Sequence, residues 1–308
     1  MSQPESGSRS GSRDAHLPAP GESWTPIRLT RWSGEYLKEK GVENGRLDAE
    51  LLLARVLNVS RLDLYLQFDR PLRPRELEAF KAFLVRRASR EPLQHMLERI
   101  PFRELDLRTD ARALIPRPET EILVGEVLAW ANRQKPGLTG LDVGTGSGAI
   151  ALSLLKEGSF QRMVGTDPSR DALDLARENA LSLGLDEQLE LREGSLFEPL
   201  RDGERFDVVV SNPPYIPEGE RDSLQAEVRD WEPPEALFAG PKGLDVLLPF
   251  VRGARAFLKS GGLLATEIGE GQGTAVVRAM EDTGAFREVC VRPDLTGRER
   301  VVMGVASG

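Results

Sequence analysis

The chain has few of the residues that build disulfides and metal centres. Its 308 residues include a single cysteine, Cys290, and only two histidines. One cysteine excludes an internal disulfide, and so small a set of thiol and imidazole groups argues against a zinc site. Cys290 lies in a stretch of alternating apolar and polar residues, where we interpret it as a packing residue. We therefore predict no metal in the functional site.

Long apolar runs and an excess of positive charge are also missing. The apolar runs are far too short to span a bilayer, and no early apolar segment resembles a secretory signal, so we expect a cytoplasmic protein. The formal net charge is −8, from 41 basic and 49 acidic residues. Proteins that bind nucleic acid through many phosphates usually carry a basic excess or a basic stripe. We therefore expect neither membrane association nor direct binding of nucleic acid.

The residue pattern divides the chain into four segments. Residues 1–22 are rich in Ser, Gly, Arg and Pro with almost no apolar side chains, which predicts a disordered tail. Residues 23–90 carry apolar side chains at helical spacing, for example over residues 76–87, and predict a small domain of about four or five helices. Residues 91–115 have the pattern of an extended or hairpin linker. Residues 116–308 form a second, larger domain.

This second domain has the pattern of a doubly wound α/β fold. Short apolar segments that predict strands alternate with helical patterns, such as residues 171–183. Such alternation indicates a mostly parallel sheet covered by helices. The predicted strands are residues 140–143, 163–166, 189–192, 206–211, 263–268, 288–292 and 301–305.

The first candidate site is a glycine-rich turn after the first of these strands. The segment Asp142-Val143-Gly144-Thr145-Gly146-Ser147-Gly148 ends a strand, turns on three glycines and leads into a helix. Glycines let the backbone approach a ligand closely, and a helix N-terminus supplies oriented N–H groups. Asp167 ends the next strand, where a carboxylate can accept hydrogen bonds from both hydroxyls of a ribose.

A glycine turn followed by an acid fits NAD as well as S-adenosylmethionine, but three features favour S-adenosylmethionine. The spacing is G-x-G-x-G rather than the G-x-G-x-x-G of dinucleotide-binding turns. Asp142 precedes the turn, where a carboxylate would favour the cationic amino-acid end of the cofactor. The sequence has no strongly basic cradle for a diphosphate. A nicotinamide oxidoreductase stays open as an alternative.

The second candidate site is the tetrapeptide Asn212-Pro213-Pro214-Tyr215, which follows a predicted strand. Ligands of open α/β sheets bind at the carboxyl ends of strands, so the tetrapeptide and the glycine turn should share one cleft. An amide or exocyclic amine nitrogen is a poor nucleophile because its lone pair is delocalised. The side-chain oxygen of Asn212 and the carbonyl of Pro213 can accept hydrogen bonds from its two N–H groups, which would direct the lone pair at a methyl donor. The consecutive prolines stiffen the segment, and Tyr215 offers a flat surface to a planar group.

With both motifs placed, the chain resembles the peptide chain release factor glutamine methyltransferase family (the PrmC/HemK type) over about residues 28–305. The tetrapeptide is shared with adenine-N6 and guanine-N2 methyltransferases, whereas residues 114–121 and the helical domain are much more specific to this family. The matching segments are residues 46–53, 90–95, 114–121, the glycine turn, residues 211–216, 243–245 and 267–269, Gln272, and residues 294–298.

The resemblance implies a class I, Rossmann-like methyltransferase fold with a seven-stranded doubly wound sheet and a small N-terminal all-helical domain. It implies methyl transfer from S-adenosylmethionine to the glutamine side-chain amide in the Gly-Gly-Gln motif of release factors. The helical domain would dock that protein, and we expect a monomer. The residues carried over as cofactor-binding are Asp142, Gly144, Thr145, Gly146, Ser147, Gly148, Asp167 and Asn212.

The resemblance also assigns the substrate side of the cleft. Asn212 to Tyr215 would hold the glutamine, and Arg117 and Glu119 either line the cleft entrance or form surface ion pairs. Two segments depart from the family: residues 99–104 lack the glycines expected in its hairpin, and Asp-Trp-Phe is common after the third strand, where this chain has Ser195-Leu196-Phe197. The carboxylate expected near the adenine amino group is absent, so Ser195 or the backbone around Leu196 must take its place.

Two further functions stay open from the residues alone. An adenine or guanine methyltransferase of nucleic acid would need a basic channel and a pocket for a flipped base. A non-catalytic scaffold that binds S-adenosylmethionine would keep the fold without the activity, because fold does not imply function.

Overall fold

The computed structural model describes residues 23–308, so the tail predicted for residues 1–22 lies outside the described part. The chain divides into two compact units between Leu97 and Glu98. Within residues 23–308, no helix combines the length and the apolar character that crossing a membrane requires.

The first unit is a bundle of short helices, which confirms the predicted N-terminal helical region. Its apolar core contains fully buried side chains such as Leu37, Leu52 and Phe80. Local sequence sets the helix ends: Ser60 and Asp63, for example, form a reciprocal capping box at the start of the third helix. The helices are α2 (Pro26–Glu39), α3 (Gly45–Leu57), α4 (Arg61–Leu66), α5 (Pro74–Ala88) and α6 (Leu93–Leu97).

The start of the linker differs from the sequence-based expectation. An extended linker is predicted from residue 91, whereas helix α6 lies there and belongs to the helical unit. Helix α6 has only 5 residues, too few to establish a helical period in the sequence. The expected hairpin follows it, because β1 (Arg99–Phe102) pairs antiparallel with β2 (Leu105–Arg108).

The second unit contains a seven-stranded sheet in the order β5-β4-β3-β6-β7-β9-β8. Neighbours from β5 to β7 pair parallel, and β9 runs antiparallel to both β7 and β8. The predicted α/β class with a doubly wound seven-stranded sheet is therefore confirmed. The strands are β3 (Leu138–Val143), β4 (Phe160–Asp167), β5 (Leu189–Glu193), β6 (Phe206–Ser211), β7 (Leu258–Glu267), β8 (Phe286–Pro293) and β9 (Glu299–Ala306).

All seven predicted strands are present, with ends that differ by a few residues. The largest difference is in β7, which begins at Leu258 rather than at residue 263. The first residues of this strand include Lys259, Ser260 and two glycines, so they lack the apolar alternation that marks a strand in sequence.

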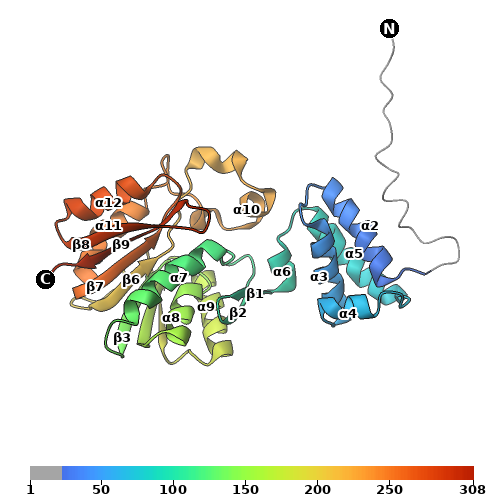
Figure 1. The fold of residues 1–308 in the computed structure, drawn as a ribbon, viewed down its shortest axis with the longest axis horizontal. Helices are drawn as coiled ribbons and strands as arrows, with labels where there is room; N and C mark the ends of the chain where they lie inside the picture. The colour runs from blue at the N-terminus through green and yellow to red at the C-terminus, as the bar shows by residue number, and fades with distance from the viewer. Residues whose placement is uncertain (1–22) are drawn as a thin grey trace, which may run out of the picture. The chain divides into compact units, whose positions relative to one another are not determined.

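Helices cover both faces of the sheet (Figure 1). Val208 and Val210 of β6 pack into one core with Leu152 of α8, whereas Val209 points to the other face and packs with Phe250 of α11. This alternation explains the near-continuous apolar strand, which is buried on both faces. The helices of this unit are α7 (Pro118–Ala131), α8 (Ala149–Glu157), α9 (Arg170–Leu183), η1 (Glu218–Ser223), α10 (Ala226–Trp231), η2 (Pro234–Ala236), α11 (Leu247–Ala254), η3 (Arg255–Phe257) and α12 (Gly273–Asp282).

The strand order reverses between β3 and β6, which is where ligands bind in open α/β sheets. Val143 at the end of β3 is in register with Ser211 at the end of β6. The hydroxyl of Ser211 donates a hydrogen bond of 2.6 Å to the carbonyl of Val143. The glycine turn and the tetrapeptide therefore begin side by side.

Candidate active site

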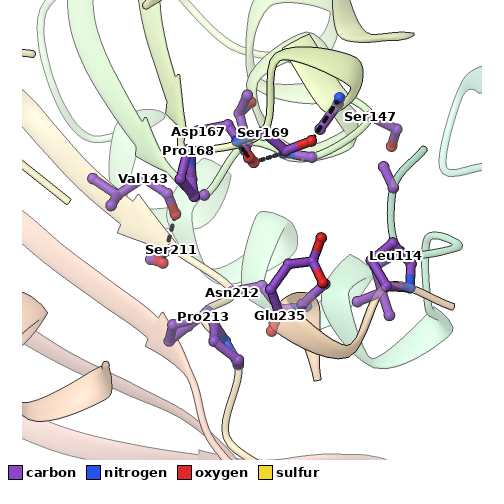
Figure 2. Close-up of a pocket in the computed structure, with 18 of the residues that line it drawn as sticks. Leu114, Val143, Ser147, Asp167, Pro168, Ser169, Ser211, Asn212, Pro213 and Glu235 are labelled. Atoms are coloured by element: carbon purple, nitrogen blue, oxygen red, sulfur yellow. Dashed lines mark hydrogen bonds between the residues drawn. The ribbon is translucent and has the colours of Figure 1, made fainter. Parts of the chain in front are cut away.

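A cavity opens at the carboxyl ends of β3, β4 and β6. It is lined by the glycine turn, residues 167–169, residues 195–196 and residues 211–214. Figure 2 shows Asp167 and Ser169 on one side of this cavity and Asn212 and Pro213 on the other. We call it the first cavity.

The backbone of two glycines forms part of the first cavity's wall. Gly144 has φ +72°, and a Cβ built there would meet no atom within 4 Å. Gly146 has φ +55°, and a Cβ there would meet only Ala113, at 4.0 Å. Both positions favour glycine on conformational grounds, and both leave open space that a side chain would fill. The turn is therefore shaped to let a ligand approach the backbone.

The third glycine of the turn has a different role. Gly148 is the N-cap of α8 with φ +83°, and it does not line the first cavity. A Cβ at this position would lie 3.1 Å from Leu152 and 3.3 Å from Ala176. Gly148 thus allows the turn to enter α8 and lets α8 and α9 pack closely.

Asp142 lies behind the turn rather than on the cavity wall, which corrects the expectation that it faces the cofactor. It is completely buried, and its Oδ2 accepts hydrogen bonds from Thr145 Oγ1 at 2.7 Å and from Ala151 N at 3.2 Å. Because successive strand residues point to opposite faces, the side chain of Asp142 is directed under the start of α8. Burial raises the pKa of Asp142 to about 7. Its contacts hold the turn in place.

Asp167 is the acid that does line the first cavity. Its Oδ2 accepts from Gly146 N and its Oδ1 from Ser169 N, each at 2.9 Å. Burial raises the pKa of this carboxyl. Each carboxylate oxygen has a further lone pair, so the pair can accept both hydroxyls of a vicinal diol.

The charges around the first cavity suit a cation better than a diphosphate. Two carboxylates, Asp167 and Glu235, are among its lining groups. The guanidinium of Arg112 also lines it, but this group is paired with Asp110 and with Glu178, each at 2.8 Å. Because two carboxylates already balance its positive charge, this guanidinium would attract a phosphate only weakly.

Arg117, the other guanidinium of the first cavity, is paired as well. It forms an ion pair with Glu232, a buried carboxylate that also accepts from Ile115 N at 3.3 Å. Burial raises the pKa of Glu232, and the charge of Arg117 opposes that rise. The two alternatives stated for Arg117 are therefore combined, since it lines the cleft and forms an ion pair there.

A second cavity adjoins the first at the tetrapeptide. It is lined by Arg117, Glu119, Arg300 and all four residues 212–215. Asn212, Pro213 and Pro214 line both cavities, whereas Tyr215 lines the second one. The tetrapeptide is therefore a wall shared by two cavities, and the structure brings it together with both residues proposed for the cleft entrance.

Hydrogen bonds link side chains of this wall to the buried Glu267. Asn212 Nδ2 donates to Thr120 Oγ1 at 3.0 Å, and Thr120 Oγ1 donates to Glu267 Oε2 at 2.7 Å. The Tyr215 hydroxyl donates to Glu267 Oε1 at 3.0 Å. Glu267 is completely buried, and burial raises the pKa of its carboxyl and that of the Tyr215 phenol. Sequence reasoning did not identify Thr120 or Glu267, although both lie in segments that carry the family resemblance.

Gln272 is another residue whose role appears only in the structure. Its side-chain nitrogen donates to the carbonyl of Tyr215 at 2.9 Å, and its side-chain oxygen accepts from Gly269 N at 2.9 Å. These contacts fix the backbone at the end of the tetrapeptide.

Ser195 and Leu196 both line the first cavity, in the segment that departs from the family pattern. Leu196 has φ +48°, and its carbonyl accepts a hydrogen bond of 3.2 Å from Thr166 Oγ1. The amide of Ser195 donates to Glu198 at 3.3 Å. The backbone here is held in one conformation, with the Ser195 side chain in place of a carboxylate.

Known proteins match both units of the chain. Residues 28–97 match the model of the PrmC N-terminal domain, and residues 120–228 match the methyltransferase small domain. The release factor glutamine methyltransferase of Geobacter sulfurreducens is 44% identical over 92% of this chain and 97% of its own length. The chain belongs to the release factor glutamine methyltransferase family. The relative from Rhodopirellula baltica is 35% identical over 91% of this chain and 95% of its own length.

Membership of this family makes the chain an S-adenosylmethionine-dependent methyltransferase, so the nicotinamide and scaffold alternatives are wrong. Among solved structures, a methyltransferase from Pyrococcus furiosus is similar in fold, with a TM-score of 0.50 and 16% identity over 66% of this chain and 90% of its own. The open glycine backbone, the available Asp167 oxygens and the paired guanidinium groups fit this cofactor.

Proposed function

We propose that this chain transfers a methyl group from S-adenosylmethionine to the side-chain amide nitrogen of the glutamine in the Gly-Gly-Gln motif of peptide chain release factors. The observation that carries the proposal is the shared wall, because Asn212, Pro213 and Pro214 line both cavities. A methyl donor in one cavity and a planar amide in the other would meet at these residues. The names of the curated relatives support the choice of substrate.

In this proposal the first cavity holds S-adenosylmethionine, which supplies a methyl group on a positively charged sulfur. The glycine turn presents its backbone to the cofactor at Gly144 and Gly146, with Thr145 and Ser147 in the same wall. Asp167 accepts the two ribose hydroxyls. Residues 195–196 lie at the adenine, where the Ser195 hydroxyl replaces the family's carboxylate. Asp142 and Gly148 support the turn from behind.

The second cavity holds the glutamine side chain. Asn212 Oδ1 and the carbonyl of Pro213 accept the two N–H bonds of its amide, and the Tyr215 ring packs against its plane. The amide nitrogen forms a new bond to carbon as the carbon–sulfur bond breaks, and it then releases one proton. No strong base is needed before this step, and orientation of the reactants can supply up to ~7–11 kcal/mol. Arg117 and Glu119 lie at the entrance to this cavity.

The helical unit, residues 23–97, docks the release factor in this proposal. It exposes large apolar side chains on and after α4: Leu62, Leu66 and Phe68 are 68%, 71% and 54% exposed. Exposed apolar groups of this size are common in protein-binding surfaces. We propose that the enzyme acts as a monomer and, because release factors work at the ribosome, in the cytoplasm.

The test is methyl transfer from labelled S-adenosylmethionine to a purified bacterial release factor, in parallel with the same factor carrying Gln→Ala in its Gly-Gly-Gln motif. We expect label on the unchanged factor and none on the variant. Label on both factors equally would contradict the proposed acceptor. Label on RNA or DNA instead, with a steep dependence on salt, would assign the chain to nucleic acid.

A further inference from the structure

The shared wall contains a side chain whose orientation decides whether it can serve the substrate. The amide oxygen and nitrogen of asparagine are nearly equal in size, so a rotation of 180° about the last side-chain bond exchanges an acceptor for two donors. Packing alone does not distinguish the two orientations of Asn212. Its hydrogen-bonding partners must do so.

The number of hydrogens on each group fixes the direction of the bonds behind Asn212. In its ionised form the Glu267 carboxylate only accepts, so it takes the hydroxyl hydrogens of both Thr120 and Tyr215. A threonine hydroxyl has one hydrogen, and once this is given to Glu267 the oxygen can only accept. Thr120 must therefore face the amino group of Asn212, as it does at 3.0 Å.

The electrostatic surroundings of Glu267 bear on this arrangement. Burial raises the pKa of its carboxyl, and the nearby charge of Glu119 acts in the same direction. The two hydroxyl donors and the charge of Arg300 act in the opposite direction. The hydrogen bonds that Thr120 and Tyr215 donate therefore favour the ionised form of the Glu267 carboxylate, against the effect of burial.

With its amino group held by Thr120, Asn212 has its oxygen left for the cavities that it lines. In the opposite orientation, the amino group of Asn212 would face the amino group of the substrate amide, and the substrate nitrogen would lose an acceptor. We infer that Thr120 and Glu267 are positioning residues, which orient the Asn212 amide so that its oxygen accepts an N–H of the substrate amide. This inference rests on the proposed function and extends it to two buried residues, Thr120 in the wall of the first cavity and Glu267 behind it.

The first experiment compares two Thr→Val substitutions that remove the same kind of bond. Thr120→Val deletes the hydroxyl between Asn212 and Glu267, whereas Thr139→Val deletes a hydroxyl that donates to Asp207 at 3.0 Å, away from both cavities. With the release factor as substrate, kcat and kcat/KM of Thr120→Val should fall together by about 10- to 100-fold. Its Kd for S-adenosylmethionine should stay within about twofold, and Thr139→Val should match the unchanged enzyme on all three.

Thr120→Ser and a double substitution separate positioning from general damage. Serine keeps the hydroxyl, so Thr120→Ser should retain kcat within about threefold. In an Asn212→Ala background, Thr120→Val should cost nothing further, because a residue that acts through Asn212 has no effect once Asn212 is absent. Equal losses from Thr120→Val in both backgrounds would overturn the inference.

A second readout needs no release factor and so separates this inference from the proposed function. In 15N-labelled protein, the side-chain amide signal of Asn212 is assigned by its disappearance in Asn212→Ala. We expect slow hydrogen exchange of this group in the unchanged protein, and faster exchange in Thr120→Val and Glu267→Gln but not in Thr139→Val. An exchange rate that is the same in all of them would overturn the inference, whatever the enzyme methylates.

Discussion

The two cavities share one wall but are built in different ways. The first presents backbone at two glycines with positive φ and has one carboxylate held by two amide N–H groups. The second also contains Tyr215, which, like Asn212 of the shared wall, is linked to the buried Glu267 by side-chain hydrogen bonds, Asn212 through Thr120 and Tyr215 directly. The difference matches what each cavity must do. Cofactor binding needs an open, rigid backbone, whereas methyl transfer needs one amide held in one orientation.

Substitution of Asn212 tests the difference between the two cavities most strongly, because this residue lines both of them. We predict that Asn212→Ala lowers kcat for methyl transfer about 100- to 1,000-fold, because the substrate nitrogen loses an acceptor and its alignment. The Kd for S-adenosylmethionine, measured by calorimetry, should change less than about tenfold. A matched control is Asn132→Ala at the exposed C-cap of α7, which should leave both constants unchanged. A larger loss in cofactor affinity than in kcat would assign Asn212 mainly to the first cavity.

Gly144 tests the backbone wall of the first cavity. We predict that Gly144→Ala raises the Kd for S-adenosylmethionine at least about tenfold, because the new methyl group projects into the cavity. Gly184→Ala is the matched control, because Gly184 has φ +67°, ends α9 and also has open space around its Cβ. Both substitutions should lower the free energy of unfolding by a similar ~1–2 kcal/mol, since both strain a left-handed residue. Similar losses of cofactor affinity in the two variants would mean that strain, not shape, is responsible.

Asp167 tests a carboxylate of that wall. We predict that Asp167→Asn weakens S-adenosylmethionine binding about tenfold, or ~1.4 kcal/mol, because one charge-assisted hydrogen bond to the ribose is lost. The control is Asp171→Asn, which changes an exposed acid in the first turn of α9. Calorimetric titration would measure both. An unchanged Kd for Asp167→Asn would remove the ribose role from this residue.

Asp142 should affect the stability of the fold rather than the binding of ligands. Its pKa is about 7 in the folded protein, against about 4 in an unfolded chain, so the folded state holds its proton more tightly. The free energy of unfolding should therefore fall as pH rises through this interval, by up to ~1.4 kcal/mol per pH unit, and level off above pH ~7. Asp142→Asn should flatten this slope in urea titrations between pH 5 and 8. An equal slope in the variant would show that another group titrates.

The sequence allowed both motifs and the sheet to be predicted because their information is local. The glycine turn, Asn212 to Tyr215 and the apolar strands are each continuous segments whose chemistry can be recognised without a partner. The prediction that Asp142 faces the cofactor was wrong, because the direction of its side chain depends on how α8 packs over β3. The bond between Thr120 and Glu267 joins residues 147 positions apart, so no local pattern contains it. Helix α6 was missed because its 5 residues are too few to establish a helical period in the sequence.

The most direct test of the account is to locate the methyl group by tandem mass spectrometry of the release factor after reaction. The account predicts one added methyl group on the peptide that contains the Gly-Gly-Gln motif, on the side-chain amide nitrogen of its glutamine. It also predicts that Asn212→Ala forms this product about 100- to 1,000-fold more slowly while S-adenosylmethionine still binds. A methyl group on another residue, or the same product at an undiminished rate with Asn212→Ala, would contradict the account.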